Sequence, residues 1–208
     1  IRSLNVIAHI RKATQGDIRL ENTHPFQREL WGRYWIFAHN GNLKDFAPQR
    51  SGRFLPVGCT DSELAFCHIL DTLATRFPEG APEPAALHAA LRALALEIGS
   101  RGEFNFLLSD GDWLFAHCSS RLCYVTRRAP FAEAHLADED LTVDFRRLTG
   151  ADDRVAVIAT TPLTDNERWV QIPPGNLIAF RDGQPVALGE TTTVAQDYPR
   201  RAPGNPTG

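Results

Sequence analysis

Four short polar clusters follow one another near the start of the chain. They are HIRKATQG (9–16), ENTHPF (21–26), AHNG (38–41) and TDSE (60–63). Together they offer a guanidinium group, a carboxylate and side-chain and backbone amides. These are the groups needed to hold an amino acid by both of its charged ends and to stabilise an oxyanion. The rest of the sequence has no comparable concentration of such groups.

Arg11 and Thr14 are candidates for binding a carboxylate. The planar fork of Arg11 matches a carboxylate with two parallel hydrogen bonds. Thr14, three residues later, can add a hydroxyl to the same anion. The alternative is an ordinary surface salt bridge of Arg11.

Asn40 and Gly41 are candidates for an oxyanion hole. The Asn40 amide and the Gly41 N–H would donate to a developing negative charge, and glycine allows close approach of the backbone. Asn-Gly is also a common hairpin turn, so a plain turn is the alternative.

Asp61 can bind an ammonium group, or it can cap the helix that begins at this point. His24 precedes Pro25 and is therefore expected in extended backbone. It can be a structural histidine that bonds to the backbone.

A metal site and a serine nucleophile are both weakly supported. Four side chains could suggest zinc: His9, His24, His39 and Cys59. They include no closely spaced ligand pair, so we expect no metal and no cofactor. Neither Ser62 nor Ser109 lies in a G-x-S-x-G motif.

The predicted elements that position these clusters are two adjacent helices between groups of strands. Helices are predicted over 61–77 and 84–99, where apolar residues recur at helical spacing. Strands are predicted over 4–9, 34–38, 104–109, 113–117, 122–127, 155–160, 169–172 and 177–181, with a last one near 186. An irregular acidic stretch covers about 133–153, and the tail from 189 is expected to be disordered. Such segregated runs indicate an α+β fold with two sheets and the helices outside.

Composition sets the broad class. The chain has 208 residues, 43% of them hydrophobic, and a net charge of −3 with scattered basic residues. This predicts one soluble domain without a nucleic-acid or membrane partner. The four cysteines form no disulfide framework, which favours free thiols and a cytoplasmic location.

The four clusters together resemble the class II glutamine amidotransferases, which are N-terminal-nucleophile hydrolases. The resemblance is closest to small stand-alone bacterial members and continues through RELWGR (28–33), the LLSDG of 107–111 and TRRAPF (126–131). It covers nearly the whole chain, which gives a domain over 1–188 and a tail over 189–208. The resemblance implies a four-layer αββα sandwich.

The same resemblance implies roles for the clusters. Arg11 and Thr14 match the residues that hold the glutamine α-carboxylate, and Asp61 matches the acid that holds the α-ammonium. Asn40 and Gly41 match the oxyanion hole. His24 matches a histidine near the site.

The nucleophile of the family is a cysteine at the start of the mature chain, whose own α-amine acts as the base. This sequence begins with Ile1 and contains no methionine. We therefore expect that an N-terminal segment with that cysteine is missing, and that this fragment alone has no glutaminase activity.

Three functions remain open from the sequence. The first is hydrolysis of the glutamine side-chain amide, with ammonia released to water or to a separate acceptor protein. The second is hydrolysis of another γ-glutamyl amide or peptide-like metabolite. The third is non-catalytic binding of glutamine or of a partner.

Overall fold

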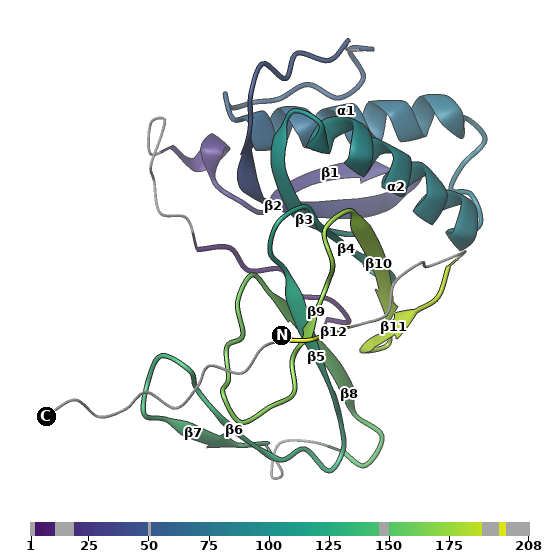
Figure 1. Ribbon diagram of the computed structural model, residues 1–208. Coiled ribbons are helices and arrows are strands. Elements are labelled where there is room, and N and C mark those ends of the chain that lie inside the picture. The colour runs from purple at the N-terminus through teal and green to yellow at the C-terminus, as the bar shows by residue number, and fades with distance from the viewer. Residues whose placement is uncertain (1–2, 11–18, 50, 146–149, 189–195, 199–208) are drawn as a thin grey trace, which may run out of the picture.

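The computed structural model describes residues 3–10, 19–49, 51–145, 150–188 and 196–198. Within them it shows a mixed α/β fold in which every paired strand is antiparallel to its neighbour (Figure 1). The fold consists of a six-stranded sheet, a four-stranded sheet and a two-stranded sheet, with two long helices.

The six-stranded sheet carries the candidate site. In spatial order its strands are β1 (Phe26–Leu30), β2 (Arg33–Leu43), β3 (Gly102–Ser109), β4 (Leu114–Cys118), β10 (Asn176–Arg181) and β11 (Gln184–Val186). The central pairing places Asn40 opposite Asn105 and Gly41 opposite Phe104. β1 pairs only with the first part of β2, because Phe26 at its start lies opposite Phe37.

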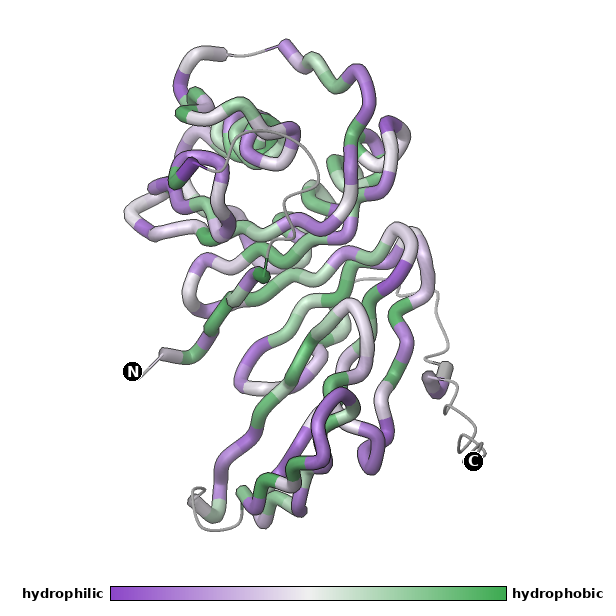
Figure 2. Tube along the Cα trace, turned by 90° about the vertical axis from the view of Figure 1, so that its left-hand side faces the viewer, coloured by the Kyte–Doolittle hydropathy of each residue, from purple (hydrophilic) through white to green (hydrophobic). Residues whose placement is uncertain are grey.

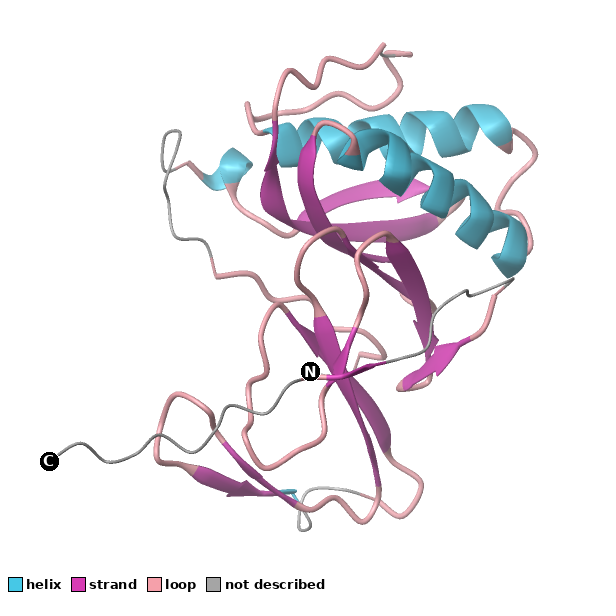
Figure 3. Cartoon of the chain, in the orientation of Figure 1, coloured by secondary structure: helices cyan, strands magenta, loops and turns pink. Residues whose placement is uncertain are grey.

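A smaller sheet lies on the side away from the helices. Its order is β12 (Gln196–Asp197), β9 (Val170–Gln171), β5 (Cys123–Arg128) and β8 (Arg154–Ala159). β6 (Glu133–His135) and β7 (Thr142–Asp144) form the two-stranded sheet at the end of the molecule farthest from the helices (Figure 3). β12 falls within the tail that was expected to be disordered, and most of that tail lies outside the described residues.

The helices are α1 (Asp61–Arg76) and α2 (Pro84–Gly99), and a short 3-10 helix, η1 (Leu20–Asn22), precedes β1. Thr60 caps α1, because its hydroxyl accepts the Glu63 N–H at 3.2 Å. Pro84 begins α2 at a position where its missing N–H costs nothing. Both predicted helices are therefore confirmed to within one residue at each end.

Two apolar cores separate three layers. The larger core lies between the helices and the six-stranded sheet and includes Phe37, Phe66 and Phe104. A second core lies between the two larger sheets and includes Phe180 and Tyr124. In Figure 2 the apolar residues concentrate along these strands and helices, whereas the loops are mainly hydrophilic. The described residues thus form an α-β-β arrangement, and a helical layer outside the second sheet is not among them.

Two sequence predictions are corrected. Residues 4–9 are not a strand in the structure, although Ile7 packs against the core between the sheets. Their alternation gives one partly buried apolar side chain, Ile7, while Leu4 and Val6 are exposed. Asn40-Gly41 is not a hairpin turn, because it lies inside β2 and pairs with β3.

Four short strands escaped the sequence analysis: β1, β6, β7 and β12. The described part of the chain contains no helix long and apolar enough to cross a membrane.

Candidate active site

Gly41 occupies a backbone position that only glycine fits. Its φ is 154°, which side-chain-bearing residues rarely adopt, and a Cβ atom there would lie 1.9 Å from the Glu103 carbonyl oxygen. The same Cβ would approach His39 Nε2 to 2.7 Å. The chain therefore runs through a narrow gap at this point of β2, with a glycine that leaves its own N–H accessible to a ligand.

The Asn40–Gly41 peptide has a defined direction. The Asn40 carbonyl accepts a hydrogen bond from Asn105 Nδ2 at 3.1 Å, so it points toward β3. In a planar trans peptide the N–H lies opposite to the carbonyl. The Gly41 N–H consequently points toward the other edge of β2, where β1 has already ended.

Asp61 lies on that same edge. Its Oδ2 accepts the Leu43 N–H at 2.7 Å, and its Oδ1 accepts the Ser62 N–H at 2.9 Å. N–H groups two residues apart in a strand point to the same edge, about 7 Å from each other. The edge therefore presents the Gly41 N–H about one pleat repeat from the Leu43 N–H that the half-buried Asp61 carboxylate accepts. Asp61 is not the cap of α1, because Thr60 has that role.

His39 connects β2 with the start of α1. Its Nε2 lies 3.0 Å from the Glu103 carbonyl oxygen and its Nδ1 lies 2.8 Å from Ser62 Oγ. A carbonyl can only accept, so Nε2 carries the proton, and Nδ1 accepts the Ser62 hydroxyl. Burial lowers the pKa of His39, although the Glu103 carbonyl and the Asp61 charge oppose that shift. Through these two hydrogen bonds the ring links β2 with β3 and with the start of α1.

The loop before α1 is held by a buried carboxylate. Glu63 accepts the N–H groups of Val57 at 3.0 Å and Gly58 at 2.7 Å, and it forms an ion pair with Arg28 of β1. The T-x-x-E pattern of 60–63 is typical of a capping box. The structure keeps the Thr60 half of that motif, whereas the Glu63 side chain fixes the loop instead.

Asn22 holds the next residue of this loop. It is 2% exposed, and its Oδ1 accepts the Cys59 N–H at 3.0 Å. The ENTHPF cluster thus contributes a structural amide in addition to His24. The signal in the sequence was only its position beside His24.

His24 lies in an aromatic stack. Its ring centroid is 4.4 Å from that of His9 and 4.6 Å from that of Phe26. His9 also lies close enough to His39 to lower the pKa of that ring through charge repulsion. Phe26 begins β1 opposite Phe37 of β2, so the stack places His24 beside the start of β1. Arg11 and Thr14 lie outside the described residues.

Three of the four cysteines are buried in unreactive surroundings. Burial raises the pKa of Cys67 and of Cys118 to about 11, and that of Cys123 to about 12. Cys59 is exposed, and its thiol lies 3.7 Å from Asn22 Oδ1. All four are free thiols.

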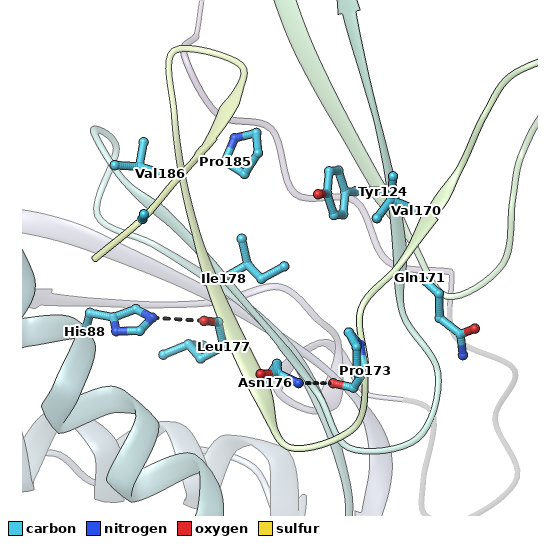
Figure 4. A pocket seen from close by; sticks show the side chains of 11 residues that line it. His88, Tyr124, Val170, Gln171, Pro173, Asn176, Leu177, Ile178, Pro185 and Val186 are labelled. Atoms are coloured by element: carbon cyan, nitrogen blue, oxygen red, sulfur yellow. Dashed lines mark hydrogen bonds between the residues drawn. The ribbon is translucent and has the colours of Figure 1, made fainter. Parts of the chain in front are cut away.

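A cavity of about 240 Å³ lies elsewhere, between α2, β10 and β9 (Figure 4). Its lining is mainly apolar and contains no carboxylate, ammonium or guanidinium group. His88 on its wall donates from Nε2 to the Leu177 carbonyl at 2.9 Å. β10 is three strand spacings from β2, about 14 Å, so this cavity is separate from the Gly41 edge. The described residues hold no cluster of three or more metal-ligating side chains.

The model of the family described as glutamine amidotransferases class-II matches residues 1–204. This chain belongs to that family. Its membership agrees with the resemblance stated from the four polar clusters.

Two bacterial relatives carry glutamine amidotransferase as a provisional name. The chain is 50% identical to YafJ of Escherichia coli strain K12 over 186 residues, which is 89% of this chain and 73% of that protein. It is 48% identical to a protein of Haemophilus influenzae over 188 residues, which is 90% of this chain and 63% of that protein.

A solved structure also matches the fold. It is the crystal structure of a predicted glutamine amidotransferase from Pseudomonas aeruginosa, with 54% identity and a TM-score of 0.74. The match covers 81% of this chain and 66% of that one. The class-II chain described here therefore spans somewhat less than two thirds of both the Haemophilus protein and the Pseudomonas structure.

Proposed function

We propose that this chain forms the substrate-holding part of an amidohydrolase that cleaves the side-chain amide of glutamine and releases ammonia. The observation that carries the proposal is the shared edge of β2. There the Gly41 N–H lies about 7 Å along the strand from the Leu43 N–H, which the Asp61 carboxylate accepts. That separation suits a free amino acid whose α-ammonium and γ-carbonyl are joined by a short aliphatic chain.

In this proposal each residue has one role. Asp61 holds the α-ammonium, while Arg11 and Thr14 hold the α-carboxylate. The Asn40 side-chain amide and the Gly41 N–H donate to the oxyanion that forms at the γ-carbon. His24 is a structural residue near the site, and its ring stacks on that of His9.

The nucleophile in this proposal is a cysteine at the N-terminus of the full-length protein. Its α-amine, with a reference pKa of about 7.7–8.0, takes the thiol proton. The thiolate attacks the γ-amide, ammonia leaves, and water hydrolyses the γ-glutamyl thioester to glutamate. The raised pKa values of Cys67, Cys118 and Cys123 make these three poor nucleophiles.

The released ammonia passes to water or to a separate acceptor protein in the cytoplasm. The four free thiols support a reducing compartment. The 208-residue fragment alone is expected to release no ammonia from glutamine.

The test uses the full-length protein that carries this sequence. Its first residue is read by N-terminal sequencing, and ammonia and glutamate are measured with L-glutamine and with γ-glutamyl amines. Equal amounts of both products from glutamine, strongly reduced at sub-saturating glutamine in Asp61→Asn but kept in the exposed control Asp182→Asn, support the proposal. Cleavage of γ-glutamyl amines but not glutamine would replace the substrate. Glutamine binding without products would leave a binding protein.

A further inference from the structure

Asn105 is a buried polar side chain within the apolar run 104–108 of β3. It is 3% exposed and lies in β3 directly opposite Asn40. Its Oδ1 accepts three backbone N–H groups, from Ser119 at 2.9 Å, Ser120 at 3.0 Å and Arg121 at 3.3 Å. Because those three groups can only donate, they fix which end of the amide is oxygen.

The other end of this amide faces the candidate oxyanion hole. Asn105 Nδ2 donates to the Asn40 carbonyl at 3.1 Å. It also lies 2.9 Å from Ser120 Oγ and 3.2 Å from Glu103 Oε1. The Asn40 carbonyl and the Gly41 N–H belong to one peptide unit, so a bond to the first restrains the direction of the second.

The bond also acts on the strength of the donor. A hydrogen bond accepted by a peptide carbonyl polarises that peptide, and its N–H becomes a better donor. An oxyanion hole depends on donors that are oriented before charge develops. Asn105 supplies both effects without touching the ligand itself.

We propose that Asn105 is a positioning residue that orients and polarises the Asn40–Gly41 peptide as an oxyanion donor. This inference rests on the proposed function, because it assigns a task to a residue behind that site. Its effect belongs to the tetrahedral intermediate and the transition states that flank it, since the oxyanion develops only there. Ground-state binding through Asp61 remains separate.

A purely structural role makes a different prediction. The Oδ1 bonds hold the loop at 119–121, and loss of that loop would disturb folding and substrate binding together. Asn105→Asp separates the two roles, because the carboxylate keeps an acceptor toward the loop and removes the donor toward Asn40. Asn105→Ala removes the donor without adding a charge beside Glu103.

The experiment measures ammonia release from L-glutamine by the full-length protein. The matched control is Asn166→Asp, since Asn166 also accepts a backbone N–H, from His135, and donates to a backbone carbonyl, that of Glu133. Affinities are measured for L-glutamate and for the γ-aldehyde analogue of glutamine, which forms an oxyanion on the cysteine. Folding of every variant is checked by its binding of L-glutamate.

Asn105→Asp is expected to lower kcat about 10-fold, because one hole donor removed outright costs about 10²–10³. KM and the glutamate Kd stay within about two-fold, while the Kd of the aldehyde rises about 10-fold, in step with kcat. Asn105→Ala lowers kcat at least as much, and Asn166→Asp does not.

The inference is overturned if kcat of Asn105→Asp stays within two-fold of the unchanged protein. It is equally overturned if glutamate binding weakens as much as kcat, or if Asn105→Ala retains full kcat. An unchanged protein that releases no ammonia defeats the proposed function, and the inference with it.

Discussion

Gly41→Ala is expected to destabilise the protein well beyond an ordinary glycine substitution. A residue held in a sparsely populated backbone region costs about 1–3 kcal/mol. The new Cβ would also lie 1.9 Å from the Glu103 carbonyl oxygen, which is backbone and cannot move aside freely. Overpacking of this kind costs a further 1–3 kcal/mol, approximately. The expected loss in the free energy of unfolding is therefore about 2–6 kcal/mol.

Gly32→Ala is the matched control. Gly32 also has a positive φ, 73°, but its Cβ would meet nothing within 4 Å. Its substitution carries only the conformational cost of about 1–2 kcal/mol. Both variants share the same gain from a stiffer unfolded chain, so this contribution cancels in the comparison.

Urea denaturation followed by tryptophan fluorescence gives the two free energies of unfolding. The reasoning holds if Gly41→Ala is less stable than Gly32→Ala by at least about 1 kcal/mol, the lower end of the overpacking cost. Equal midpoints and slopes for the two variants would show that β2 can shift away from Glu103. In that case the narrow gap at Gly41 is not a constraint of this fold.

Three further results are expected. Asp61→Asn in the full-length protein should raise KM for glutamine about 10- to 100-fold, because a charge-assisted bond is worth about 1.5–3 kcal/mol. The amide oxygen of the variant can still accept the Leu43 N–H, so the free energy of unfolding should change little. A loss of stability as large as the loss of binding energy would argue against ammonium binding by Asp61. His39 has a lowered pKa in the folded state, so the unfolded chain gains its proton at a higher pH than the folded chain. Stability therefore declines as pH falls below about 6.5, the ordinary pKa of histidine. His39→Gln should flatten this decline by up to about 1.4 kcal/mol per pH unit, and an unchanged slope in denaturation at pH 5–7 would refute it. Among the cysteines of this chain only Cys59 should react with a maleimide in the folded state; peptide mass analysis that finds label at Cys67 without denaturant would contradict the burial.

Local signals predicted the helices and most strands well. α1 and α2 follow from a stripe of apolar residues between clear start and stop residues. The Asp182-Gly183 pair does form the predicted turn between β10 and β11. The strand over 4–9 was predicted wrongly because alternation reports a buried face, whereas a strand also requires a partner chain that lies elsewhere in the sequence.

The site was predictable only in part. The sequence indicated Asp61, Asn40 and Gly41 as candidate site residues. That the Gly41 N–H and Asp61 lie on the same edge of β2 depends on strand register, which no local sequence pattern contains. Asn105 was missed because it acts through backbone groups of a loop that lies later in the chain, at 119–121. Glu63 was noted only as part of its cluster, and its role in holding the loop before α1 was missed. A lone asparagine within the apolar run of β3 was a visible signal, since a buried amide must find partners.

β1 begins at Phe26, opposite Phe37 of β2, and this limit has a consequence for association with other chains. Beyond it, the described residues give the last part of β2 no neighbour strand on that side, and such an edge can template pairing with another chain. Asp61 occupies the Leu43 N–H with a carboxylate, which repels an incoming strand that would offer carbonyl groups. One acidic side chain thus opposes pairing of this open part of the sheet edge with another chain.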